Sequence, residues 1–148
     1  MAESTLIVFL TVSACILLVA VRWINSCSQP SHRLGVHGGR LADCPDSPNC
    51  VSTQVGPPNI VSIRYHCRCR LRRPNTIWSQ YIRSMPRSRI VSSCTGYFHA
   101  EFTSPLLGFV DDVEFAIDER EHLIHFRSAS RSGRSDLGVN RKRMEQVR

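Results

Sequence analysis

The residues with the most potential chemistry are a histidine and three acids that fall two apart in neighbouring apolar stretches. They are His99 and Glu101 in the first stretch, and Asp112 and Glu114 in the second. Residues two apart in a β-strand project from the same face, so a hairpin between the stretches would gather all four side chains. Such a carboxylate-rich cluster could hold a hard metal ion, and it would suit a metal-dependent hydrolase.

Arginines follow these acids directly in the sequence, and they suggest a second interpretation. Like charges held close together are normally neutralised, and Arg127, Arg131 and Arg134 are available for this. Asp111 is predicted on the apolar face of its strand, where an unpaired carboxylate would be costly, and Arg127 is its expected partner. An internal ion-pair network is therefore favoured over a metal site, and no cofactor is expected.

A loop rich in serine, arginine and glycine covers residues 128–136 and precedes a predicted helix. Its polar residues of interest are Ser130, Arg131, Arg134 and Asp136. Backbone N–H groups at a helix start, together with guanidinium groups, could bind phosphate or carboxylate. The alternative is a capped turn, in which Asp136 or Ser135 accepts hydrogen bonds from the helix N–H groups. The loop lacks the spacing of a Walker or dinucleotide-binding motif, and the cap is the favoured interpretation.

Several separated blocks of the sequence resemble one known family. The blocks are 34–36, 39–41, 44–52 with Gln54, 100–102 with Ser104, 109–115 and 127–143. In this order they resemble the domain-of-unknown-function family 1499 (DUF1499), although Thr53, Arg134 and the stretch 65–73 depart from its pattern. The resemblance implies small bacterial and plastid-lineage relatives without an assigned activity, so it assigns no substrate.

The elements that would position these residues follow from the hydrophobic pattern. The predicted strands cover 60–65, 90–94, 97–103, 109–117 and 123–128. Helices are predicted from 74 until Pro86 stops the first, and over 137–147 for the second. We expect an α+β fold: an antiparallel meander sheet with the helices packed on one face, preceded by a single N-terminal transmembrane helix.

The N-terminal run 5–21 contains no charged residue and predicts a membrane-spanning helix. Its length of about 26 Å falls short of a hydrocarbon core of roughly 30 Å, but Arg22 can snorkel and let Trp23 and Ile24 complete the span. A cleaved secretory signal, lipoprotein processing at 12–15 and a buried helix stay open as alternatives. We expect an anchor at 1–24, a linker at 25–33 and a single α+β domain at 34–148.

Charge and cysteines give opposite indications of the side of the membrane. The net charge is +7, and Arg22, Arg33 and Arg40 follow the apolar run, which by the positive-inside rule would keep the domain in the cytoplasm. Cys44 and Cys50 flank a turn-forming loop, and a disulfide between them would stabilise it by about 2 kcal/mol in an oxidising compartment. We expect this disulfide and an extracytoplasmic domain.

Two further sets of residues carry weaker signals. The arginines of the stretch 64–73 favour a solvated face over contact with lipid, and nucleic acid is not an expected partner because interleaved aromatic residues are missing. Cys67 and Cys69 could join Cys44, Cys50 and His66, but the spacing matches no familiar zinc site.

The sequence predicts a membrane-tethered, non-enzymatic binding or assembly module with an acid and arginine surface. Its expected partners are the membrane and either another protein of a membrane complex or anionic lipid headgroups. The alternative is a metal-dependent hydrolase or other enzyme that uses Glu101, Asp112 and Glu114.

Overall fold

The protein combines a long N-terminal helix with one antiparallel sheet and two further helices. The computed structural model describes residues 2–30, 33–54 and 74–147, and the expected strand at 60–65 and the arginines of 64–73 lie outside them. The elements are α1 (Ala2–Ser26), β1 (Cys50–Ser52), α2 (Pro74–Ser84), β2 (Ser88–Cys94), β3 (Tyr97–Thr103), β4 (Val110–Asp118), β5 (Leu123–Ser130) and α3 (Val139–Val147).

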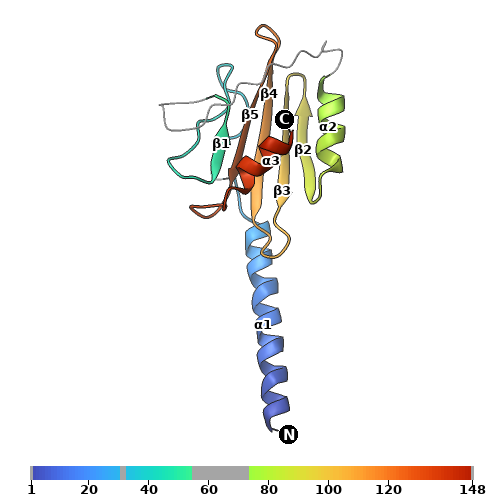
Figure 1. The fold of residues 1–148 in the computed structure, drawn as a ribbon, viewed down its shortest axis with the longest axis vertical. Coiled ribbons are helices and arrows are strands. Elements are labelled where there is room, and N and C mark those ends of the chain that lie inside the picture. Colours follow the sequence, from blue (N-terminus) through green and yellow to red (C-terminus); the bar gives the residue numbers. More distant parts are fainter. Residues whose placement is uncertain (1, 31–32, 55–73, 148) are drawn as a thin grey trace.

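The sheet has the strand order β1-β5-β4-β3-β2, and every neighbouring pair is antiparallel (Figure 1). Strands β2 to β5 form the meander that the alternating pattern predicts. Strand β1 was not predicted, because three residues are too few to display a period of two. It pairs with the end of β5, where Cys50 lies opposite Ala129. The α+β fold class is confirmed.

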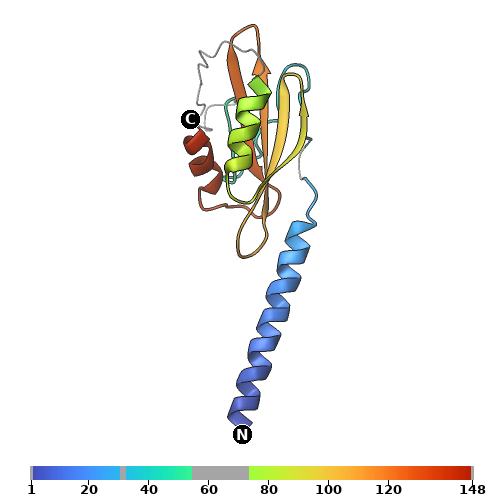
Figure 2. The ribbon, with the colours of Figure 1, turned by 90° about the vertical axis from the view of Figure 1, so that its right-hand side faces the viewer.

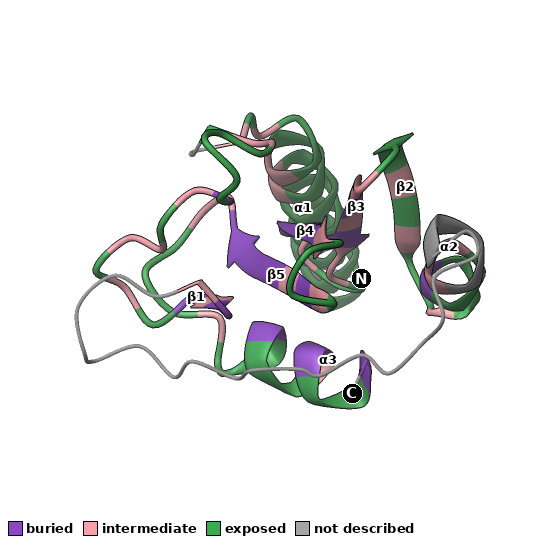
Figure 3. Ribbon diagram, turned by 90° about the horizontal axis from the view of Figure 1, so that it is seen from above, coloured by how far each residue is buried: buried purple, intermediate pink, exposed green. Residues whose placement is uncertain are grey.

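One face of the sheet forms the hydrophobic core beneath α2 and α3. Phe98, Phe115 and Phe126 project from three neighbouring strands, and Ile82 of α2 and Met144 of α3 pack against them. The rings of Phe98 and Phe115 stack with centroids 4.4 Å apart. Buried residues follow β4, β5 and the inner side of α3 (Figure 3). Both helices therefore lie on one face, as expected from the sequence (Figure 2).

The opposite face of the sheet is polar, and the chain that follows α1 runs along it. Arg131 donates from Nη1 to the Ser28 carbonyl at 2.8 Å. The Gly35 amide donates to Glu114 Oε1 at 2.7 Å. The stretch expected as a linker, 25–33, is thus hydrogen-bonded to Arg131 through Ser28, and Gly35 just beyond it is bonded to β4, while the division into anchor, linker and domain stays a prediction. Below, the sheet with α2 and α3 is called the α+β domain.

Helix α1 leaves one end of the α+β domain and carries exposed apolar side chains along its length (Figure 1). The segment Glu3–Ser26 is long and apolar enough to cross a membrane. Its last turns contact the loop between β3 and β4. Gly108 lies so close that an added Cβ would be 2.9 Å from the Arg22 carbonyl oxygen, and its φ of +71° also favours glycine.

Candidate functional site

Strand register brings the predicted acidic residues together on the polar face. Glu101 lies opposite Asp112 across β3 and β4, and His99 lies opposite Glu114. Strand β5 then places Arg127 opposite Glu114. Because paired residues of adjacent strands project to the same side, the hairpin gathers these side chains as the period of two predicts.

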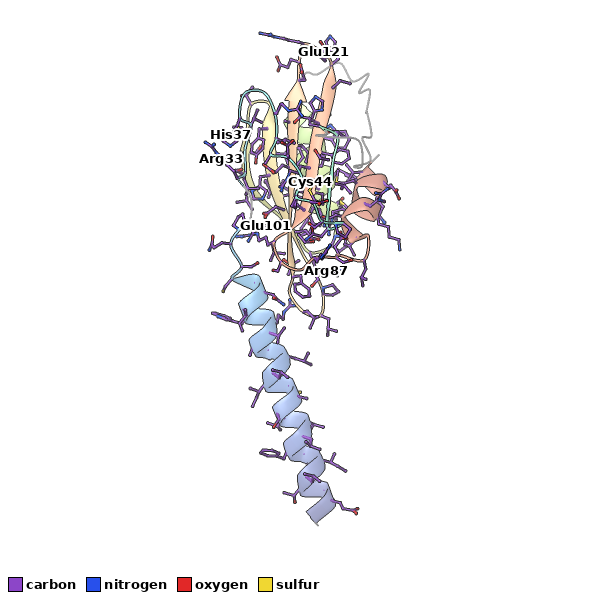
Figure 4. The ribbon with its side chains drawn as sticks, turned by 90° about the vertical axis from the view of Figure 1, so that its left-hand side faces the viewer. Arg33, His37, Cys44, Arg87, Glu101 and Glu121 are labelled. Atoms are coloured by element: carbon purple, nitrogen blue, oxygen red, sulfur yellow. A yellow bond between two sulfur atoms is a disulfide. The ribbon has the colours of Figure 1, made fainter. Side chains whose placement is uncertain are left out.

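Arg131 is the centre of the first group on this face. It donates to both carboxylate oxygens of Asp112, from Nε at 2.9 Å and from Nη2 at 2.7 Å. Its Nη2 also donates to Glu101, whose other carboxylate oxygen accepts a 2.6 Å bond from Arg89. His99 Nε2 lies 2.8 Å from Asp112 Oδ1. Glu101 lies at the end of the α+β domain nearest α1 (Figure 4).

The electrostatics of this group follow from its hydrogen bonds. Burial alone would raise the pKa of Asp112, but hydrogen bonds from Arg131 and His99 outweigh it and lower that pKa. The pKa of Glu101 is lowered in the same way, since bonds from Arg89 and Arg131 exceed the effect of burial. Hydrogen bonds to Asp112 and Glu101 raise the pKa of Arg131. The two acids are therefore held ionised by arginine.

Glu114 is the centre of a second group on the polar face, and it is fully buried. Arg127 Nη1 donates to its Oε2 at 3.2 Å, and the Tyr97 hydroxyl donates to its Oε1 at 2.8 Å. Burial and the neighbouring carboxylate raise the pKa of Tyr97, so the phenol stays protonated and can donate. Arg127 Nε and Nη2 lack a hydrogen-bond partner among the described residues.

Asp111 projects from the other face, and its partner was predicted wrongly. Its Oδ2 accepts a 2.7 Å bond from Arg143 of α3, and its Oδ1 accepts a 2.6 Å bond from Ser130. Arg127 cannot reach it, because Arg127 lies opposite Glu114 in the register and so projects from the polar face. The Arg143 guanidinium also lies 4.4 Å from the centre of the Phe102 ring, a cation–π contact.

Sequence reasoning missed the group of residues beneath α3. Asn140 donates from Nδ2 to the Asn49 carbonyl at 3.2 Å and to Ser130 Oγ at 3.0 Å. Its Oδ1 accepts a 2.8 Å bond from Arg143 Nη1. The signal available was spacing: Asn140 and Arg143 lie three residues apart, which places them on one face of α3, and Asp136 lies four residues before Asn140 in the turn that precedes the helix.

The loop before α3 is a capped turn. Asp136 accepts bonds from the Asn140 amide at 2.7 Å and the Gly138 amide at 3.0 Å. Ser130 and Arg131 are engaged inside the fold by the contacts above, whereas Arg134 is exposed. These contacts occupy most of the predicted anion cradle, and anion binding stays a prediction.

The disulfide between Cys44 and Cys50 is confirmed, with the Cα atoms 5.7 Å apart. It closes the loop that carries Asn49, which is buried. The Asn49 carbonyl accepts bonds from Asn140 and, at 3.0 Å, from the Ser130 amide. The disulfide loop is thereby joined to both β5 and α3.

The metal alternative gains no support from this geometry. Within 2–30, 33–54 and 74–147, no three His, Cys, Asp or Glu side chains are grouped so that they could hold a metal ion. Glu101, Asp112 and Glu114 instead accept bonds from arginine. Cys67, Cys69 and His66 lie outside the described residues.

A family model described as a protein of unknown function, DUF1499, matches residues 40–148. No curated protein and no solved structure matches the chain. The matched range includes the disulfide loop, the whole sheet, α2 and α3, and therefore both groups of buried ion pairs. The chain belongs to the DUF1499 family, as the resemblance of its separated blocks predicted.

Proposed function

We propose that the protein is a membrane-tethered, non-enzymatic binding or assembly module. The observation that carries this proposal is the exposure of α1. Its apolar side chains are exposed to 58% at Leu6, 64% at Leu17 and 68% at Val19. A contiguous apolar surface of this size is unfavourable in water and marks a surface that meets lipid or another protein.

The non-enzymatic part of the proposal rests on the state of the acids. A catalytic acid or base needs access to a substrate and a pKa near the working pH. Glu114 and Asp112 are buried, and Asp112 and Glu101 have lowered pKa values because arginine holds them. These groups suit a structural role better than proton transfer.

We propose that the α+β domain lies on the oxidising side of the membrane. The Cys44–Cys50 disulfide supports this side, because such bonds persist in oxidising compartments. Arg22 and Arg33 favour the opposite side by the positive-inside rule. Treatment of intact cells with an external protease decides between them, because only an extracytoplasmic domain would be cleaved, and a protected domain would contradict this orientation.

Alkaline carbonate extraction of membranes tests the tether. The full chain should stay in the membrane pellet. Mass spectrometry of the intact chain should give a mass that accounts for every residue from residue 2 onward. Replacing both Leu10 and Leu17 by arginine should release the chain, since a charge at mid-span is costly. Val91→Arg, at an exposed position on β2, is the matched control and should stay in the pellet. Release of the unaltered chain, or a mass that lacks α1, would refute the tether.

The partner surface can be tested at an exposed arginine of the loop before α3. Arg134 is exposed and can be replaced without breaking an ion pair of the site. Arg131 is bound to Asp112 and Glu101, so its replacement would destabilise the site itself. Arg134→Ala should reduce co-purification of proteins or anionic lipids with the detergent-solubilised chain, and Arg141→Ala on the exposed side of α3 is the control. Equal recovery from both variants would exclude Arg134 from the surface.

A further inference from the structure

We propose that the loop between β3 and β4, residues 104–109, inserts Leu106 into the anionic headgroup layer of the bilayer that α1 enters. The segment between β5 and α3 contributes Leu137 to the same contact. This inference rests on the proposed function, because the depth of both segments in the bilayer follows from α1 spanning that bilayer. It adds a second membrane contact, made by the α+β domain itself.

The 104–109 loop is fixed to the last turns of α1. Arg22 Nη1 donates to the Pro105 carbonyl at 2.8 Å, and Asn25 Nδ2 donates to the Leu107 carbonyl at 2.8 Å. Leu106 lies between these two bonded residues in the sequence, so its backbone is held at the level of Arg22 and Asn25. Gly108 also packs closely against Arg22 and Ser26, so the loop meets the last turns of α1 at a third residue.

The length of α1 sets that level within the bilayer. From Thr5 to Ile24 the helix rises about 28 Å, close to the roughly 30 Å of the hydrocarbon core. Arg22 lies in the last turn of this span, so its guanidinium reaches the boundary between hydrocarbon and headgroups on the side of the α+β domain. Trp23 is 73% exposed beside it, and tryptophan is enriched at this depth. Leu106, fixed beside the same turn, must lie among the headgroups.

Leu106 and Leu137 have the exposure expected of residues that meet lipid. Leu106 is 68% exposed and Leu137 is 94% exposed. Leu137 also has φ of +55°, a conformation that leucine rarely adopts. Leu137 is thus a residue with a strained backbone whose apolar side chain meets solvent.

The segment that carries Leu137 lies at the same end of the α+β domain. Arg131, at the start of this segment, is bonded to the carbonyl of Ser28, two residues beyond α1. The β3–β4 loop and the segment between β5 and α3 both lie toward α1, whereas the β4–β5 loop lies at the far end (Figure 1). Both exposed leucines are thus on segments near the membrane-side end.

The charge of the two ends differs, and this favours anionic lipid. Arg87 lies near α1, and Glu121 lies at the far end (Figure 4). Arg134 is exposed on the segment of Leu137, and Arg22 lies at the headgroup boundary. The far loop contains three acids, Asp118, Glu119 and Glu121, against one arginine, Arg120. Arginines are attracted to anionic lipid headgroups, and this attraction adds to the binding that a few buried apolar side chains provide.

Methyl-labelled leucine NMR of the full chain in lipid nanodiscs tests the inference. A lipid with a nitroxide in its acyl chain should broaden the leucine methyls of α1, which tests the tether. A gadolinium-chelating headgroup lipid should remove most of the Leu106 and Leu137 methyl intensity. Leu123 begins β5 beside the far loop and is the internal control, so its methyls should keep their intensity. Leu106→Val and Leu137→Val assign the two signals.

The outcomes separate the two proposals. Broadened α1 methyls with sharp Leu106 and Leu137 methyls would overturn the inference and leave the tether intact. Sharp α1 methyls would overturn the tether and the inference together. Loss of the Leu106 signal alone would remove Leu137 from the contact.

The charge component is tested in nanodiscs that contain anionic lipid. Arg87→Glu should restore part of the Leu106 methyl intensity, because repulsion lifts this end of the α+β domain. Arg120→Glu makes the same change at an exposed residue of the far loop and should leave the intensity low. Equal broadening in both variants, or equal broadening in neutral nanodiscs, would overturn the choice of anionic lipid.

Discussion

The two faces of the sheet neutralise their acids with arginines from different sources. On the polar face, Asp112 and Glu114 are paired with Arg131 and Arg127, which belong to β5 or follow it directly. On the core face, Asp111 is paired with Arg143 of α3. Partners within a sheet are fixed by strand register, whereas a partner from a helix depends on how that helix packs. The comparison predicts that the two faces respond differently to mutation.

The largest expected effect is at Glu114, which is fully buried with Arg127. Glu114→Gln should lower the free energy of unfolding by about 4 kcal/mol, because it leaves the buried guanidinium without a counter-charge. Chemical denaturation of the detergent-solubilised chain measures it. The double variant Glu114→Leu with Arg127→Leu should recover most of the loss. If Glu114→Gln lowered the free energy of unfolding by less than an average surface substitution does, the Glu114–Arg127 pair would not be a buried ion pair.

A smaller effect is expected on the core face. Arg143→Gln should cost about 2 kcal/mol, since it removes charge-assisted bonds to Asp111 and the contact with Phe102. Arg141→Gln, two residues earlier and exposed, is the control and should change the free energy of unfolding little. If Arg143→Gln proved more costly than Glu114→Gln, the ranking of the two faces would be reversed.

The disulfide should contribute a comparable amount, and it should act on α3 through Asn49. Cys44→Ser with Cys50→Ser should lower the free energy of unfolding by about 2 kcal/mol by the chain-entropy estimate. Asn49 should then hold Asn140 less firmly, so amide exchange should rise in α3 and stay unchanged in β3. Faster exchange in β3 would show that the loop also supports the polar face.

The smallest expected effect is a dependence on pH that arises from the polar face. Asp112 and Glu101 have lowered pKa values in the folded state, so the unfolded state binds protons first as the pH falls. The stability from these groups is complete above about pH 4.5 and is lost as pH falls through the lower folded values. Melting temperatures across this range should fall less steeply for Asp112→Asn. An equally steep fall would place the pH dependence elsewhere.

The polar face could be predicted from the sequence because its geometry is local. The period of two placed Glu101, Asp112 and Glu114 on one side, and the short turns between strands required antiparallel pairing. The same reasoning could not find Arg143 as the partner of Asp111, because the packing of α3 depends on contacts distant in the sequence. Strand β1 was missed for a related reason, since only its pairing with β5 makes Cys50–Ser52 a strand.

A double-mutant cycle between Arg131 and Asp112 tests most directly the claim that the polar-face acids serve the fold. Free energies of unfolding would be measured for Arg131→Gln, Asp112→Asn and the double variant. The two side chains share two hydrogen bonds in a buried site, which predicts a coupling energy of about 2 to 3 kcal/mol. A coupling energy near zero, with each single variant as stable as the unaltered chain, would contradict this account.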